Sequence, residues 1–251
     1  MPLRLLGVFA HAIDGPLLSG GVLAGCAAEG AETMVLYAAG AGAEPGAARE
    51  AARALQVPRV VLLDYEAGRL DGLAPSTLTG VLRDVYRSFQ PHVVVTLASE
   101  EGPAGDPDHL AVHRAASAAF HQVRRSSSGR RPAPLRLYYA GLVRRQAEHL
   151  LPRALAGRVP CPGPWSRQSI DARVTAVVDV RRHLEAKLRA LATALPGADM
   201  QDLGPWLGYE SFARAFPEPW VSGVVERALL AGIHDEQAGT PPAPGALGRA
   251  G

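Results

Sequence analysis

The sequence has few cysteines and no long apolar run, and each deficit excludes a class of protein. Only two cysteines, Cys26 and Cys161, occur among 251 residues, and neither belongs to a CxxC pair. We therefore expect no thiolate metal knuckle and no disulfide framework. Because no stretch of about 18 uninterrupted apolar residues occurs, no membrane span is predicted. The first residues do not have the layout of a signal peptide, which predicts a cytoplasmic protein.

The sequence also lacks an excess of positive or negative charge. The 26 Lys and Arg residues nearly balance the 24 Asp and Glu residues, and the net charge is +2. Nothing in this balance calls for nucleic acid or an anionic membrane as a partner. With 47% hydrophobic and 20% charged residues, the composition is that of an ordinary globular protein. The sequence leaves the oligomeric state open.

Short apolar runs alternate with helical patterns along the first 140 residues. We expect strands over 3–10, 33–38, 59–64, 92–97 and 135–140, and helices over 16–29, 46–56, 76–89 and 109–123. This alternation predicts an α/β fold, a Rossmann-like, doubly wound and mainly parallel sheet with helices on both faces. The continuous apolar run HVVVTL is typical of a strand that is covered on both faces.

The pattern weakens beyond residue 140. There we expect a loop over 151–168, a strand over 172–178, and helices over 180–195 and 222–233. The composition favours a single domain over 1–235 and a disordered tail over 236–251, which is rich in Pro, Gly and Ala.

Two polar segments follow the first and fourth expected strands. The first is AHAIDG (residues 10–15) and the second is ASEEGPAGDPDH (residues 98–109). In the common strand order 3-2-1-4-5, the first and fourth strands are neighbours where the order reverses, and ligands bind beyond their carboxyl ends. The topology therefore predicts that the two segments face each other across one crevice.

These segments carry side chains that suit a metal ion. His11 and Asp14 are three residues apart on a turn, and His109 opens the next helix. Two histidines and one carboxylate with an open position form a catalytic zinc pattern. Each residue has an ordinary alternative: Asp14 could cap a helix, and His11 could be a simple loop residue. Asp108 could cap the helix near His109, and His113 could form an alternative HxxxH metal pair with His109.

Other site motifs are absent. The glycine-rich stretch SGGVLAG (residues 19–25) lacks the GxGxxG spacing, and its glycines fall inside a helix, so no dinucleotide site is expected. Gly20 and Gly21 are instead expected to allow close packing of this helix on the sheet. No GxSxG nucleophile elbow is present either, which argues against a serine hydrolase.

At these two segments the chain resembles the LmbE / PIG-L superfamily of deacetylases. AHAID (10–14) followed by GG (20–21) resembles the family's AHPDD and glycine pair, and GDPDH (105–109) resembles its GHPDH. FQPHVVVTLA (89–98), LYYAGL (137–142) and VTAVVDVRRHLEAKLRAL (174–191) resemble further family segments. The resemblance covers about residues 3–195.

The resemblance implies a single zinc ion held by His11, Asp14 and His109. Family members hydrolyse an N-acetyl or related amide, often on a glucosamine unit. The expected function is therefore zinc-dependent N-deacetylation of a small molecule, an amino-sugar conjugate or related amide.

Two departures from the family motifs affect the proton-transfer groups. Ile13 stands where the family has its general base, and isoleucine cannot accept a proton. Asp106 stands where the family has a histidine that stabilises the oxyanion or protonates the leaving amine, and an ionised Asp106 would repel an oxyanion. Ala67 also occupies the expected place of a further family Asp.

Three accounts are compatible with this pattern. In the first, Asp106 or Asp108 serves as the catalytic base of an active amidase, or Glu100 or Glu101 reaches in from the loop. In the second, the chain is a metal-binding relative with another reaction or substrate. In the third, it is a catalytically impaired protein of the same fold that binds a metal or a partner.

Overall fold

The computed structural model describes residues 2–40, 45–98, 106–127, 133–154, 170–218 and 226–233. The expected disordered tail over 236–251 lies outside these residues, as do Cys161, Glu100 and Glu101. No helix among the described residues is long and apolar enough to cross a membrane.

A seven-stranded sheet forms the centre of the described structure, with the order β3-β2-β1-β4-β5-β7-β6. Its strands are β1 (Arg4–Phe9), β2 (Glu32–Tyr37), β3 (Arg59–Leu62), β4 (Val93–Leu97), β5 (Arg136–Gly141), β6 (Ala176–Asp179) and β7 (Tyr209–Phe216). The first five strands are parallel, and β7 runs antiparallel to both β5 and β6. The predicted fold class and the order of its first five strands are confirmed.

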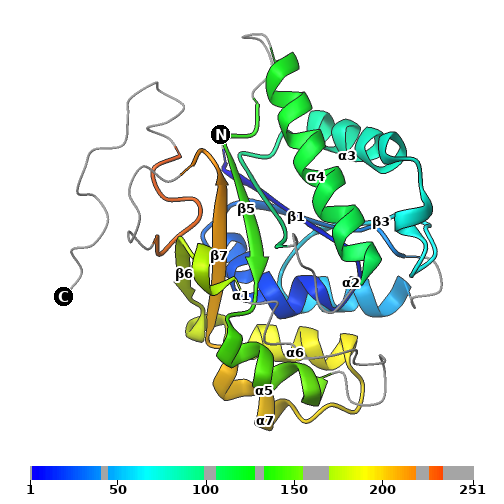
Figure 1. The fold of residues 1–251 in the computed structure, drawn as a ribbon. Helices are drawn as coiled ribbons and strands as arrows, with labels where there is room; N and C mark the ends of the chain where they lie inside the picture. Colours follow the sequence, from blue (N-terminus) through cyan, green and yellow to red (C-terminus); the bar gives the residue numbers. More distant parts are fainter. Residues whose placement is uncertain are drawn as a thin grey trace.

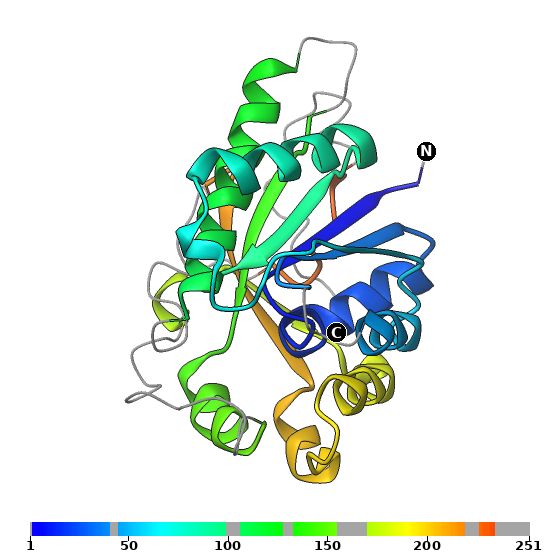
Figure 2. The ribbon, with the colours of Figure 1, turned by 90° about the vertical axis from the view of Figure 1, so that its right-hand side faces the viewer.

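Helices cover both faces of this sheet (Figures 1 and 2). One face carries α3 (Pro75–Phe89) and α4 (Pro107–Ser126), which pack against each other. The other face carries α1 (Asp14–Ala28), α2 (Pro45–Ala54) and α6 (Leu184–Ala194). Two further helices, α5 (Arg144–Ala154) and α7 (Met200–Leu203), lie at the same end of the molecule as α6, and α7 contacts both α5 and α6.

The sheet is buried on both faces, and its central strands are mostly apolar. Every residue of β1 (RLLGVF) and β4 (VVVTL) is buried. Strand β1 pairs with β2 on one side and with β4 on the other, so the chain reverses its winding between β1 and β4. This switch point places the segment after β1 beside the start of α4, as the topology predicts.

The prediction of a loop over 151–168 is wrong at its start. Residues 151–154 belong to α5, which begins at Arg144, and the remainder of the predicted loop falls outside the described residues. Ala147 and Leu150 of α5 are buried in a second apolar cluster with Leu191 and Leu203 from α6 and α7. The helix is therefore stabilised by packing that its polar sequence does not reveal.

The predicted helix over 222–233 begins outside the described residues, which resume at 226, and it is wrong over 226–232. Residues 226–232 form a single β-bridge and turns, because the backbone of Glu226 hydrogen-bonds to β6 and its flank: its N–H donates to Thr175 O, and its carbonyl accepts from Val177 N–H. The predicted strand over 172–178 is displaced, since β6 begins at Ala176. The predicted helix over 180–195 is confirmed as a short 3-10 turn followed by α6.

The prediction that Gly20 and Gly21 allow close packing of the helix on the sheet is wrong about the neighbour, although the packing at both glycines is close. A Cβ added at Gly21 would lie 2.3 Å from Val180 Cβ, and one at Gly20 would lie 3.3 Å from Lys187 Cγ. These contacts belong to α6 and to the segment that leads into it. The glycine pair therefore lets α1, which carries Asp14, lie directly against α6.

Candidate metal centre and active site

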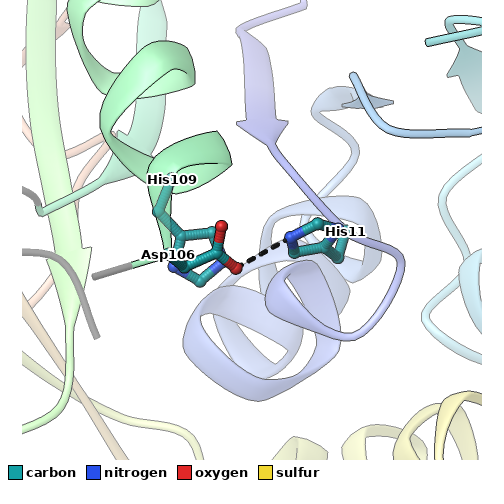
Figure 3. Close-up of side chains that lie close together, drawn as sticks. All are labelled: His11, Asp106 and His109. Atoms are coloured by element: carbon teal, nitrogen blue, oxygen red, sulfur yellow. Dashed lines mark hydrogen bonds and ion pairs between the residues drawn. The ribbon is translucent and has the colours of Figure 1, made fainter. Parts of the chain in front are cut away.

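Side chains from two segments far apart in the sequence meet beyond the carboxyl ends of β1 and β4. His11 lies in the turn between β1 and α1, whereas Asp106 and His109 lie at the start of α4 (Figure 3). One ligand atom from each of these three residues lies within 4.8 Å of the others. The structure thus brings together the two histidines that the sequence singled out, with Asp106 between them.

Asp14 is the first residue of α1 and is almost fully buried. The alternative that it caps this helix is wrong, because residue 13 occupies the cap position and no side chain caps it. Instead, Asp14 Oδ2 accepts the backbone N–H of His11 at 2.8 Å and lies 3.2 Å from His109 Nε2. Asp14 thereby fixes the turn that carries His11 and contacts the second histidine.

Asp106 is the N-cap of α4, where Pro107 occupies the first helical turn. Its Oδ1 accepts the backbone N–H of Asp108 at 2.9 Å, which leaves Oδ2 to face the histidines. Oδ2 lies 3.0 Å from His11 Nε2 and 3.7 Å from His109 Nε2. The Asp-Pro pair is a helix-start signal that could have identified this cap from the sequence.

Asp108 is fully buried and holds a neighbouring loop. Its Oδ2 accepts the N–H of Gly68 at 2.6 Å, and its Oδ1 accepts the N–H of Leu70 at 2.9 Å. It does not cap α4, because Asp106 does. Its Oδ2 also lies 3.8 Å from His11 Nε2. Sequence reasoning did not foresee that the loop after β3 would be tied to the site through these two backbone groups.

His109 has the environment expected of a metal ligand. It is 7% exposed, and among the described residues neither of its ring nitrogens forms a hydrogen bond of good geometry. A buried polar atom without a partner is costly, unless an ion or a water supplies the missing interaction. Two imidazoles and nearby carboxylates are ligands that suit zinc, so the residues fit a divalent metal ion.

Without a metal, the two histidines hold their protons more tightly than usual, and Asp14 and Asp106 lose theirs more readily. Burial lowers the pKa of His11, but the hydrogen bond to Asp106 and the charges of the nearby aspartates outweigh burial and raise this pKa to about 9. Burial likewise opposes ionisation of Asp106, but the hydrogen bond to His11 and the charges of both histidines bring its pKa down to about 2. The pKa of His109 is raised and that of Asp14 is lowered, because their mutual attraction outweighs burial.

Other candidate residues from the sequence have different surroundings. His113 Nδ1 lies 2.8 Å from the carbonyl oxygen of Leu97, and its ring packs against Tyr139. This arrangement favours a structural role over an HxxxH metal pair. Ile13 is partly buried and packs against the second apolar cluster, so the position of the family base lies in an apolar environment.

Comparison with known proteins identifies the family. The sequence profile of the GlcNAc-PI de-N-acetylase (PIG-L) family matches residues 6–120. A 1D-myo-inositol 2-acetamido-2-deoxy-alpha-D-glucopyranoside deacetylase from Rhodococcus opacus is 32% identical over 238 residues, which cover 75% of this chain and 80% of the relative. The chain therefore belongs to the LmbE / PIG-L superfamily.

A relative of the same description from Gordonia bronchialis is 36% identical over 179 residues. The match covers 61% of this chain, and the chain spans only 58% of that relative's length. Solved structures show the same fold. An N,N'-diacetylchitobiose deacetylase from Pyrococcus horikoshii has a TM-score of 0.55 at 15% identity, covering 87% of each chain. The 4-carboxy-2-hydroxymuconate hydratase from Pseudomonas putida KT2440 has a TM-score of 0.59 at 17% identity, covering 88% of this chain and 99% of the hydratase.

Proposed function

We propose that this chain is a metal-dependent amide hydrolase that deacetylates an amino-sugar conjugate. The observation that carries this proposal is the meeting of His11, Asp14 and His109 from two loops at the switch point of the sheet. The names of the curated relatives, which are deacetylases of an acetamido sugar linked to inositol, support the substrate class.

We infer that His11, Asp14 and His109 would hold one zinc ion. When bound, zinc supplies Lewis acidity toward an amide carbonyl and makes an attacking water more acidic. The protein holds these three side chains ready through the bond from the His11 N–H to Asp14 and through the burial of His109. Asp14 carries its negative charge readily, because its pKa is lowered.

We propose Asp106 as the group that accepts a proton at Oδ2. Ile13 cannot fill this role, and Asp106 is ionised over the whole neutral range because its pKa is about 2. A carboxylate with so low a pKa is a weak base. The negative charge of Asp106 also disfavours an oxyanion beside it. For both reasons we expect slow turnover. Asp108, whose two oxygens accept backbone N–H groups, is assigned to positioning the loop at 68–70.

The second candidate is a metal-binding protein of the same fold with impaired hydrolysis or another reaction. The observation that favours it is the apolar packing of Ile13 at the position of the family base. The fold does not distinguish the two candidate functions, because proteins of one fold can catalyse different reactions.

An assay of amine release tests the proposal. Zinc-loaded protein is incubated with N-acetylglucosamine conjugates, including an inositol-linked one, and free amine is measured. The proposal expects release that is lost in His11→Ala and His109→Ala but kept in His121→Ala, a histidine farther along α4. Stoichiometric zinc without release from any conjugate would favour the second candidate.

A further inference from the structure

We propose that Asp106 is itself a ligand of the metal in the resting protein. Its carboxylate then occupies the coordination position that a substrate would need. This inference rests on the metal site of the proposed function. Its starting point is the placement of Asp106 Oδ2, which lies 3.0 Å from His11 Nε2 and 3.7 Å from His109 Nε2 (Figure 3).

Three separations between these atoms suit side chains that bind one metal ion. Ligand atoms bonded at about 2.0–2.1 Å to a tetrahedral zinc ion lie about 3.3 Å from one another. Besides the two separations from Asp106, Asp14 Oδ2 lies 3.2 Å from His109 Nε2. These three separations, between 3.0 and 3.7 Å, lie close to the tetrahedral value. Asp106, rather than Asp14, is grouped with the two histidines within 4.8 Å.

The protein also fixes the direction of this carboxylate. Asp106 Oδ1 is held by the N–H of Asp108, and the side chain of Asp108 is held in turn by Gly68 and Leu70. With Oδ1 engaged at the helix cap, Oδ2 is directed at the histidines. His109, with more than nine-tenths of its side chain buried and neither nitrogen hydrogen-bonded among the described residues, faces the same point.

A fourth protein ligand would change how the site works. Two carboxylates and two neutral histidines balance the charge of a divalent ion, and a site with four protein ligands lacks the open position of a catalytic zinc site. A substrate could then enter only when Asp106 leaves. The freed carboxylate would be placed to accept a proton, so the ligand and base roles of Asp106 would alternate.

The experiment uses Asp106→Asn, which keeps an oxygen for the helix cap but is a poor metal ligand. Asp106→Ser is a second variant that retains a capping side chain. Asp199→Asn is the matched control, because Asp199 caps α7 in the same way, through the N–H groups of Gln201 and Asp202. For each protein, zinc affinity is measured by competition with a chelator. The visible spectrum of the Co²⁺ form is then recorded during titration with azide.

If Asp106 is a ligand, Asp106→Asn and Asp106→Ser bind zinc at least about tenfold more weakly. The loss of a residue that only hydrogen-bonds to a metal ligand already lowers metal affinity by about that factor. Their Co²⁺ spectra shift, and azide binds them more tightly than it binds the parent protein, while Asp199→Asn behaves like the parent. Unchanged affinity and unchanged spectra in both variants would overturn the inference and leave the proposed function standing. A parent protein that binds no metal would overturn both.

Discussion

Metal binding at this site is expected to release protons, and the number released can be derived from the structure. Histidine must be neutral to bind a metal ion. Because the pKa of His11 is about 9 in the metal-free protein, this residue is almost entirely protonated at pH 7.5. The pKa of His109 is raised as well, whereas Asp14 and Asp106 have lowered pKa values and are already ionised. Between about one and two protons should therefore leave for each ion bound at this pH.

Isothermal titration calorimetry measures this number when zinc is added in two buffers that differ in ionisation enthalpy. Two histidines of ordinary pKa would together release only about 0.2 protons at pH 7.5. A value near 0.2, with zinc bound at full stoichiometry, would refute the ion-pair arrangement of the metal-free site. The apparent affinity should also rise with pH until His11 has titrated, at about pH 9.

The same shifts set the pH dependence of the metal-free fold. The folded-state pKa of His11 lies above its unfolded value of 6.5, so its stabilising contribution is complete below that value and is lost as the pH rises through about 9. The pKa of Asp106 lies below its unfolded value of 3.8, so its contribution is present above that value and is lost as the pH falls through about 2. Denaturant unfolding across this range should show both losses, and a flat profile above pH 7 would contradict the first.

Three substitutions give further predictions. Lys187→Met should lower the free energy of unfolding by about 3–5 kcal/mol, since it leaves the charge of the buried Glu210 without its counter-ion. Urea unfolding of the double variant Lys187→Met/Glu210→Gln should recover part of that loss, because glutamine is uncharged and keeps an acceptor oxygen for the N–H groups of α1. Asp108→Ala should cost about 1–3 kcal/mol for each stranded N–H, which urea unfolding also measures; a loss below 0.5 kcal/mol, roughly, would contradict its structural role. Ile13→Asp should raise amine release by up to about 10²–10⁴-fold, because it restores a carboxylate at the position of the family base, where the weakly basic Asp106 now acts alone; no gain with zinc still bound would contradict this.

The sequence predicted the first five strands and the meeting of His11 with His109, because both follow from apolar runs and parallel topology. Strand β7 was missed because its sequence, YESFARAF, contains charged residues. These residues can be buried only because they form ion pairs and hydrogen bonds with residues far away in the sequence. Glu210 accepts from Lys187 on α6 and from two N–H groups of α1, and Arg214 pairs with Glu226. No local pattern reveals such pairs.

The candidate site was predictable in its residues but not in its internal arrangement. Spacing placed Asp14 near His11, yet the direction of the Asp106 carboxylate depends on its cap to Asp108 and on the loop at 68–70. The cap is local, but the contacts of Asp108 with Gly68 and Leu70 join segments separated by about forty residues. For the same reason, the sequence suggested Asp108 as a base or a cap, whereas its oxygens hold the backbone of another loop.

Metal content is the most direct test of the central claim that the turn after β1 and the start of α4 together bind one divalent metal ion. Protein purified without a chelator or a histidine tag is analysed for bound metal, stripped, and titrated with zinc. The account predicts one equivalent per chain, lost in the double variant His11→Ala/His109→Ala and retained in His121→Ala. Parent protein that carries no metal and takes up none in a saturable manner would contradict it.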